Sequence, residues 1–324
     1  MINAVIVGLG GWGQTLVTSV QGKSDLIRFT RGVTRTPSKA ADYAAEMGFP
    51  LDDDYAAALA DPEIDAVVLA TPHTQHAEQM EAAAAAGKHI FVEKPFTLTK
   101  ESAAASVAAA EKAGIVLALG HNRRFLPAVA ELRRRIEAGE LGTLSHVDAN
   151  FSGNPSLRYP ADAWRADPAE APAGAMSPIG IHMVDLLIGL FGPIAEVHAQ
   201  SFRLASELPI DDTTSMLFRF ETGMTACFAT LGATARMLKL VVYGNKAWAE
   251  LRGEPTLVIT SMDGEEEVVE FPPFDKEKAE LEAFAEAVEG KSAYPIPGEE
   301  AIHGIAVFEA IVRSIETGET APVA

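Results

Sequence analysis

The chain has 324 residues, of which 48% are hydrophobic, and its formal net charge is −19. This apolar content favours folded cores over disorder, and at about 150 residues per domain the length predicts roughly two domains. The negative charge disfavours nucleic acid and anionic lipid surfaces as partners, because both carry charge of the same sign.

Cysteine usage and the N-terminus bear on the cellular compartment. Cys227 is the only cysteine, so no disulfide can form within the chain and nothing indicates an oxidising environment. The opening residues MINAVIVGLGGWG lack the basic region and cleavage site of a signal peptide, and no apolar run reaches the roughly 18 residues of a membrane span. We expect a soluble, cytoplasmic protein.

Residues 1–121 alternate short apolar runs with alanine-rich segments that favour helix. The predicted strands are 3–8, 26–34, 65–71, 88–92 and 115–120. Strands that alternate with helices indicate a parallel sheet covered on both faces. We therefore predict an N-terminal α/β domain of the doubly wound, Rossmann type.

Residues 122–324 show a different pattern. An amphipathic helix (126–138) and a strand-like run (143–152) precede a proline-rich stretch (158–174) and a helical segment (179–192). Alternating runs follow at 196–204, 213–223, 224–231, 239–244, 247–253, 256–261 and 266–271, and helices at about 276–289 and 298–316 end the chain. Many strands joined by short turns predict an α+β domain with a mostly antiparallel sheet.

GLGGWG, residues 8–13, fits the dinucleotide-binding pattern G-x-G-x-x-G between the first strand and the first helix. Gly8 permits the tight turn, Gly10 lets the backbone approach a pyrophosphate, and Gly13 allows the helix to pack closely. Gly11 and Trp12 belong to the same predicted cofactor loop. An ordinary glycine turn is the alternative, but the position after the first strand favours a dinucleotide site.

The end of the second strand bears on the choice of cofactor. About 20 residues beyond the glycines, an NAD site usually carries an acidic residue for the ribose 2′-hydroxyl. Here Thr34, Arg35 and Thr36 stand at that point. Arg35 can pair with a 2′-phosphate and the threonines can donate hydrogen bonds to it, so NADP is favoured over NAD. Alternatively, Arg35 is a solvated loop residue.

FVEKPF, residues 91–96, places a lysine directly after a predicted buried strand. Lys94 therefore stands at the carboxyl end of a parallel strand, where ligands of α/β domains bind. Pro95 fixes the turn and Glu93 can offset the charge of the lysine. An ammonium here can hydrogen-bond a substrate oxygen and stabilise negative charge on it. A surface lysine is the alternative when the position is taken by itself.

The chain resembles the Gfo/Idh/MocA oxidoreductase family over nearly its whole length. The resemblance rests on GLGGWG (8–13), ATPHTQHAEQ (70–79), GKHIFVEKPF (87–96), GHNRRFLPA (120–128), GIHMVDLLIGLFGP (180–193) and EAIVRSIETGE (309–319). It implies a Rossmann domain (1–121) followed by an open-faced sheet domain (122–324) for substrate binding and oligomerisation. It also implies oxidation or reduction of sugars, polyols, cyclic diols and similar carbonyl compounds with NAD(P), and assembly into homodimers or homotetramers.

The resemblance adds His182 to Lys94 as a catalytic candidate. His182 would exchange a proton with the substrate oxygen. Asp185 lies three residues later, on the same face of a helix, and is a candidate for orienting the imidazole. On periodicity alone, a core histidine near a helix start is the alternative.

This sequence departs from the family pattern D-x-G-x-H, because Pro178 stands where the acid is usual. Three interpretations remain open. Lys94 and His182 suffice, or another carboxylate such as Asp162 or Asp167 enters the site, or the redox chemistry is altered or absent.

The resemblance implies further cofactor contacts after the third, fourth and fifth strands and in the proline-rich stretch. These candidates are Thr71, Pro72, His73, Glu93, Lys94, Asn122, Arg123, Trp164 and Arg165. For Thr71-Pro72 a helix entry is the alternative, and for Arg123 a solvated surface.

No metal site is predicted. His73 and His76 are three apart, but no cysteine or carboxylate cluster of known ligand spacing accompanies them. Cys227 lies in the strand-like run MTACFATL without a flanking base, which predicts a core residue.

The cofactor motifs favour NADP, and the family resemblance implies an oxidoreductase that acts on a secondary alcohol or carbonyl of a sugar, polyol or cyclic diol. A regulatory protein that senses cofactor or sugar on the same fold is the alternative, and Pro178 is the feature that supports it.

Overall fold

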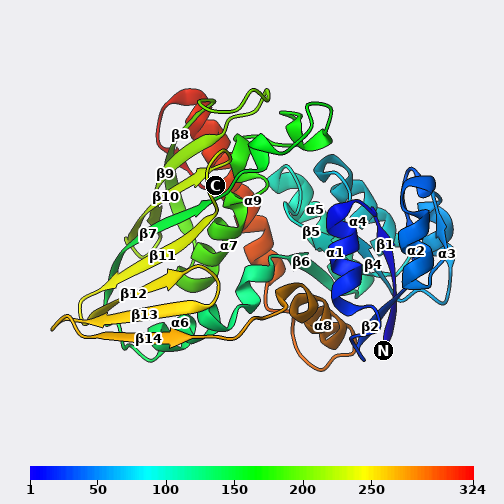
Figure 1. The fold of residues 1–324 in the computed structure, drawn as a ribbon, viewed down its shortest axis with the longest axis horizontal. Helices are drawn as coiled ribbons and strands as arrows, with labels where there is room; N and C mark the ends of the chain where they lie inside the picture. Colours follow the sequence, from blue (N-terminus) through cyan, green and yellow to red (C-terminus); the bar gives the residue numbers. More distant parts are fainter. The chain divides into compact units, whose positions relative to one another are not determined.

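A computed structural model describes residues 1–324, which form two compact units (Figure 1). The first contains residues 1–122 and 275–302, and the second contains residues 123–274 and 303–324. The break after residue 122 lies one residue from the expected boundary. The segment 275–302, expected in the second domain, packs with the first unit instead.

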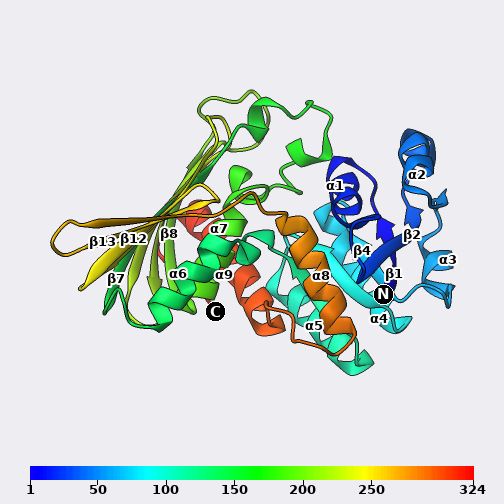
Figure 2. The same ribbon diagram turned by 60° about the horizontal axis from the view of Figure 1, so that its bottom comes forward.

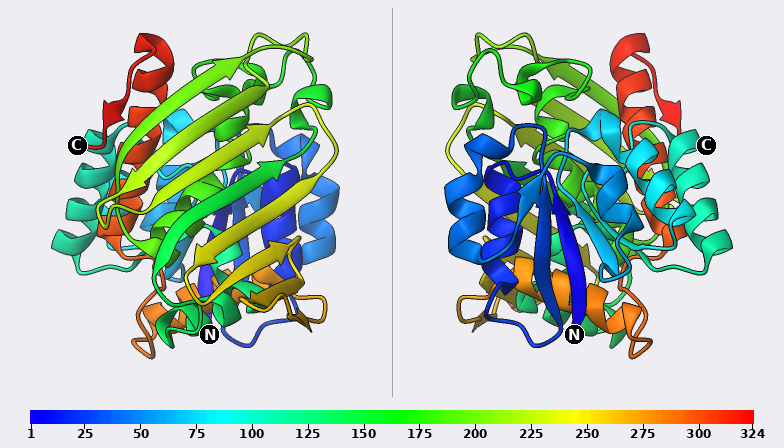
Figure 3. Two further views of the ribbon diagram at one scale, coloured as in Figure 1. Left: turned by 90° about the vertical axis from the view of Figure 1, so that its left-hand side faces the viewer. Right: turned by 90° about the vertical axis from the view of Figure 1, so that its right-hand side faces the viewer.

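The first unit is built on a six-stranded parallel sheet, visible in the right-hand view of Figure 3. Its strands are β1 (Ile2–Val7), β2 (Ile27–Val33), β3 (Leu51–Asp52), β4 (Ala66–Leu69), β5 (His89–Glu93) and β6 (Leu117–Gly120). Their order is β3-β2-β1-β4-β5-β6, which confirms the predicted Rossmann fold. The chain order reverses between β1 and β4, and ligands of such sheets bind beyond the carboxyl ends of the strands at that point.

Helices cover both faces of this sheet. They are α1 (Gly11–Val20), α2 (Ala41–Met47), α3 (Tyr55–Ala60), α4 (His76–Ala85), α5 (Lys100–Ala113) and α8 (Lys276–Val288). Helix α4 packs on β4, β5 and α5, whereas α8 packs on α1, β2 and β5. Phe284 of α8 lies in one core with Phe91 of β5, their ring centroids 5.8 Å apart. Apolar contacts of this kind hold α8 in the first unit although it is distant in sequence.

The second unit is built on a nine-stranded sheet. Its elements are α6 (Pro127–Glu137), β7 (Leu144–Ser152), α7 (Gly180–Phe191), β8 (Ile194–Phe202), β9 (Thr213–Phe220), β10 (Thr225–Leu231), β11 (Met237–Gly244), β12 (Ala247–Arg252), β13 (Thr256–Ser261), β14 (Glu266–Glu270) and β15 (Ala321–Pro322). The order is β14-β13-β12-β11-β7-β10-β9-β8-β15, with β7 and β10 parallel and the other neighbours antiparallel. The mostly antiparallel sheet is therefore confirmed. Helix α9 (Gly298–Thr317) begins in the first unit and ends in the second.

One face of the nine-stranded sheet is covered by helices and the other is open (Figures 2 and 3). Helices α6, α7 and the later part of α9 lie on the covered face, where their apolar residues share one core with the strands. Strand β9 shows the division: Met216 and Phe218 are buried, whereas Leu217 between them is 55% exposed. Alternate residues of a strand point to opposite faces, so the open face carries its own set of side chains.

The expectation that Cys227 is a core residue is wrong. Ala226 and Phe228 point into the core, so the two-residue period of β10 turns Cys227 to the open face, where it is half-buried. The apolar run MTACFATL predicted the strand but not which of its residues face the core.

None of the helices combines the length and the apolar composition that crossing a bilayer requires.

Candidate active-site residues in the two units

The glycine loop between β1 and α1 needs glycine at two positions. Gly8 has φ of +94°, and a Cβ atom built on it would lie 2.6 Å from the carbonyl oxygen of Ala70. A Cβ atom on Gly13 would collide with the carbonyl oxygen of Gly8. The loop and the first turn of α1 therefore pack against each other and against the end of β4.

The same loop fits the pyrophosphate of a dinucleotide. Cβ atoms built on Gly10 and Gly11 meet nothing within 4 Å, so a ligand can approach the backbone there. Helix α1 has no side-chain cap and no acidic residue in its first turn. Its first N–H groups thus remain available to an anion. Trp12 packs with its apolar part against the core beneath the loop.

The residues after β2 lie at the surface. Arg35 and Thr36 are exposed and Thr34 is half-buried. The two-residue strand β3 brings an unexpected carboxylate near them: the N–H of Thr34 donates to the carbonyl oxygen of Asp52 at 2.9 Å. The side chain of Asp52 pairs with Arg31 at 2.6 Å, and this pairing offsets the charge that would otherwise oppose a phosphate.

The loop after β4 contains Thr71, Pro72 and His73. Thr71 donates a hydrogen bond to Gln79 at 2.6 Å, and His73 is buried. His76, which is fully buried, places its Nδ1 2.9 Å from the carbonyl oxygen of Pro95 and its Nε2 3.1 Å from that of Thr71. The imidazole therefore joins the loops that follow β4 and β5, a positioning role that the sequence did not reveal.

Lys94 follows β5 and is half-buried, and its peptide bond to Pro95 is cis. The preceding Glu93 is only 4% exposed. Burial raises the pKa of this carboxyl to about 7, against a lowering by the nearby Lys94 charge. A carboxyl buried directly before the lysine therefore titrates near neutral pH, which is typical of functional sites.

Asn122 ends the first unit and is buried. Its side-chain amide donates to Glu277 of α8 at 3.0 Å, and Glu277 also pairs with Lys276 at 3.5 Å. Helix α8 thus fixes the segment after β6. The sequence predicted that Asn122 belongs to the site but did not reveal Glu277 as its partner.

In the second unit, His182 lies in the first turn of α7 and is 5% exposed. Its ring contacts that of Phe151, with centroids 6.2 Å apart. Asp185 does not take the expected partner: both of its carboxylate oxygens accept from Arg124, at 2.7 and 2.9 Å. The fork of a guanidinium matches a carboxylate, so Asp185 anchors Arg124 rather than orienting His182.

Arg123 is also largely buried, contrary to the solvated alternative. Its guanidinium lies 4.5 Å from the centroid of the Phe151 ring and 3.8 Å from a carboxylate oxygen of Glu254. In the loop between β7 and α7, the guanidinium of Arg165 stacks on Trp164 at 4.1 Å.

Pro178 precedes α7 and is half-buried. The two carboxylates proposed to replace the missing acid, Asp162 and Asp167, are exposed, and Asp167 accepts a hydrogen bond from the N–H of Ala169. Glu170 is the buried carboxylate of this loop, at 8% exposure. Sequence alone did not single it out, because loop burial has no periodic signal.

A parallel sheet with a glycine loop after its first strand is typical of a dinucleotide-binding domain, and in this chain an open-faced sheet domain follows it. Residues 2–121 match the oxidoreductase family with an NAD-binding Rossmann fold, and residues 129–250 match the GFO/IDH/MocA C-terminal domain. The chain therefore belongs to the Gfo/Idh/MocA family, and it is an NAD(P)-dependent oxidoreductase by class.

Named relatives share much of the chain. It is 29% identical over 324 residues to a D-xylose 1-dehydrogenase (NADP(+)) of Haloferax volcanii, covering 97% of both chains. It is 37% identical over 146 residues to scyllo-inositol 2-dehydrogenase (NAD(+)) of Bacillus subtilis, covering 44% of this chain and 42% of that protein. A putative NADPH-dependent oxidoreductase structure from Desulfitobacterium hafniense superposes with a TM-score of 0.93 at 26% identity, covering 99% of this chain and 97% of that one.

Proposed function

We propose that the protein transfers hydride between NADP(H) and a secondary alcohol or carbonyl of a sugar, polyol or cyclic diol. The observation that carries this proposal is Lys94, which directly follows β5 at the same sheet edge as the glycine loop and comes after the buried Glu93. The names of the relatives, a xylose dehydrogenase and an inositol dehydrogenase, support the substrate class.

Lys94 is the group that polarises the substrate oxygen. Its ammonium donates a hydrogen bond to that oxygen and stabilises negative charge that develops on it. Glu93 lowers the cost of holding the ammonium at a partly buried position. His76 supports the lysine by fixing the carbonyl of Pro95.

His182 exchanges the proton of the substrate oxygen. Its near-complete burial limits competing exchange with water, and its place in the first turn of α7 fixes the direction of the ring. Asp185 contributes indirectly, by holding Arg124 against the same helix. The nicotinamide, when bound, supplies or accepts the hydride.

The cofactor preference rests on the loop after β2. Arg35 has no side-chain partner of its own and is exposed, so its fork is available to a 2′-phosphate, with Thr34 and Thr36 beside it. Further cofactor contacts fall to the loop after β4, to Asn122 and Arg123, and to Trp164 and Arg165. Assembly as a homodimer or homotetramer would use the open sheet face, whose exposed residues include Leu217 and Met237.

The proposal is tested by following nicotinamide absorbance with NADP(H) and NAD(H) against sugars, inositols, keto-sugars and cyclic diols. We expect turnover that prefers NADP(H) and falls about a hundred- to a thousandfold in Lys94→Met, because an oxyanion-stabilising group contributes roughly that factor. Lys88→Met, a lysine of the same unit bonded to the carbonyls of Asp61 and Ile64, is the control. Equal turnover in wild type and Lys94→Met would reject the assigned role.

The second candidate is a sensor that binds cofactor or sugar without turnover, and Pro178 in place of the usual acid favours it. A sensor would bind NADPH tightly and leave its absorbance unchanged with every compound of the panel. Pro178→Asp separates the enzyme from the sensor. In an enzyme, the substitution changes an existing turnover rate. In a sensor, the wild type has no turnover, and the substitution would at most introduce it.

A further inference from the structure

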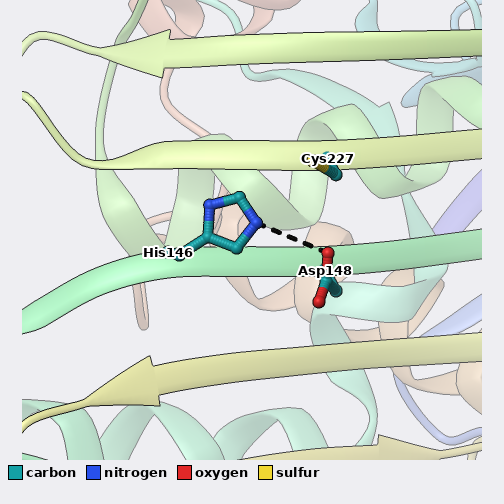
Figure 4. A group of neighbouring side chains, drawn as sticks. All are labelled: His146, Asp148 and Cys227. Atoms are coloured by element: carbon teal, nitrogen blue, oxygen red, sulfur yellow. Dashed lines mark ion pairs between the residues drawn. The ribbon is translucent and has the colours of Figure 1, made fainter.

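We propose that His146, Asp148 and Cys227 on the open face of the nine-stranded sheet bind one divalent transition-metal ion of the zinc class. The imidazole, carboxylate and thiol each offer a ligand atom, and these atoms all lie within 4.8 Å of one another. Figure 4 shows His146 and Asp148 on one strand, joined by a dashed line, and Cys227 beside Asp148 on the neighbouring strand.

The sheet register creates this group. His146 and Asp148 are two residues apart on β7 and so share a face, and Cys227 of β10 lies directly opposite Asp148. About 80 residues separate the cysteine from the other two, so no spacing pattern of zinc-binding sequences applies. The prediction of no metal site weighed His73 and His76 and took Cys227 for a core residue, so it did not include this set.

Two neighbouring hydroxyl groups orient the ligands. Thr225 Oγ1 lies 2.7 Å from Nδ1 of His146, and a hydrogen bond donated by Nδ1 to it leaves Nε2 unprotonated. Tyr243 donates to Oδ2 of Asp148 at 3.0 Å, which leaves Oδ1 facing Nε2 at 3.4 Å. Metal-binding histidines and carboxylates are commonly held by such outer hydrogen bonds.

The lone pairs of the three groups also favour a cation. With Nδ1 of His146 donating to Thr225, Nε2 and the carboxylate oxygen 3.4 Å away both present lone pairs, and the sulfur of Cys227 adds a third. A proton satisfies only one of these contacts, whereas a metal ion satisfies all three. Nitrogen, sulfur and oxygen ligands together select zinc and similar late transition metals over magnesium and calcium.

The geometry requires only small adjustments. The bonds of a tetrahedral zinc ion are about 2.0–2.3 Å long, so its ligand atoms lie about 3.5 Å from one another. Side-chain rotations that move the three ligand atoms by about 1 Å would therefore close the site. All three side chains are half-buried, and Asp148 and Cys227 line a hollow of about 620 Å³ on the sheet. Water from this hollow would complete the tetrahedron. The ligands come from one chain, so the ion can load before two sheets meet.

The test is a cobalt titration of the full chain, stripped of metal and kept reduced. We expect a thiolate-to-cobalt charge-transfer band that saturates at one ion per chain. One equivalent of Zn²⁺ should remove it, and an excess of Mg²⁺ should not. Cys227→Ser should lose the band, and His146→Gln and Asp148→Asn should each weaken binding at least about tenfold. Circular dichroism and thermal unfolding of each variant establish that it is folded.

Two further variants separate a built site from incidental binding. Thr225→Val removes only the hydrogen bond to His146 and should lower cobalt affinity about tenfold while keeping the band. His198 lines the same hollow but does not belong to the proposed metal site. His198→Gln should therefore change neither the cobalt affinity nor the charge-transfer band. The proposal is overturned if no saturable band forms, or if the band survives in folded Cys227→Ser. An equal loss of affinity in Thr225→Val and His198→Gln would also overturn it.

Discussion

At the level of single residues, Glu93 shows how burial changes chemistry. The carboxyl stands beside the ammonium of Lys94, yet the removal of water outweighs that attraction and its pKa lies near neutrality. The pair therefore carries a charge that depends on pH at the position where a substrate oxygen is proposed to bind.

Glu93→Gln tests this pKa through stability. A folded-state pKa of about 7, against an ordinary value of 4.5, means that the folded protein holds the proton more tightly. Protonated Glu93 therefore adds at most about 3 kcal/mol to the free energy of unfolding. This stabilisation is complete below about pH 4.5 and is lost as pH rises through 7. Urea unfolding between pH 5 and 8 should show this fall in wild type relative to Glu93→Gln. Exposed Glu63→Gln is the control, and a constant difference between wild type and Glu93→Gln would contradict the raised pKa.

Arg35→Ala tests the cofactor preference. Loss of a charge-assisted contact to a 2′-phosphate should weaken NADPH binding about tenfold or more and leave NADH binding unchanged. Fluorescence titration of both cofactors measures the ratio. Arg28→Ala, which removes the same charge near the other end of β2, should leave the ratio at the wild-type value. If Arg35→Ala does the same, Arg35 is only a solvated loop residue.

Among the elements, α7 is held by an ion pair that the sequence did not predict. Arg124 and Asp185 have side chains only 4% and 7% exposed, and the arginine also donates to the carbonyl oxygen of Asp185 at 3.1 Å. Asp185 thus connects the helix to the segment before α6. It serves the site by keeping α7, and with it His182, in place.

Asp185→Ala should lower the free energy of unfolding by roughly 3–5 kcal/mol, because it removes the carboxylate from a buried ion pair. Glu196→Ala is the contrasting variant, since the side chains of Glu196 and its partner Arg219 are 38% and 46% exposed and surface pairs contribute little to stability. Chemical denaturation of both variants gives the comparison. Similar small losses would show that the pair is not structural, and unchanged stability with lost turnover would restore a direct catalytic role for Asp185.

For the molecule as a whole, the open sheet face is a surface that no helix of the chain covers (Figures 2 and 3). Exposed apolar residues on it include Leu217, at 55%, and Met237, at 50%. Contiguous apolar surface of this kind marks association sites, which supports the proposed homodimer or homotetramer.

Leu217→Glu should shift the assembly toward monomer, because a charge on the buried face of an interface is costly. Sedimentation velocity at several concentrations measures the state. Met262→Glu is the control, since Met262 is 74% exposed in the turn after β13. A wild-type protein that sediments as a monomer would reject this interface.

Local patterns along the chain were enough to predict most elements, the Rossmann fold and the glycine loop. Such features depend on periodicity and on short motifs, so GLGGWG and FVEKPF could be interpreted from their residues and neighbours in the chain. The face to which each strand residue points, and the pairing of distant side chains, could not be predicted in this way. Whether Cys227 faces the core or the open side depends on which neighbours flank β10. Asp185 pairs with Arg124, which is 61 residues away in the sequence.

Contacts between distant segments became evident only in the folded protein. Helix α8 lies on the first sheet, where Phe284 completes a core and Glu277 bonds Asn122. Folding also assembles His146, Asp148 and Cys227 from two strands. The cause is the same in each case: desolvation and contact depend on distances in space, which a linear pattern constrains only over a few residues.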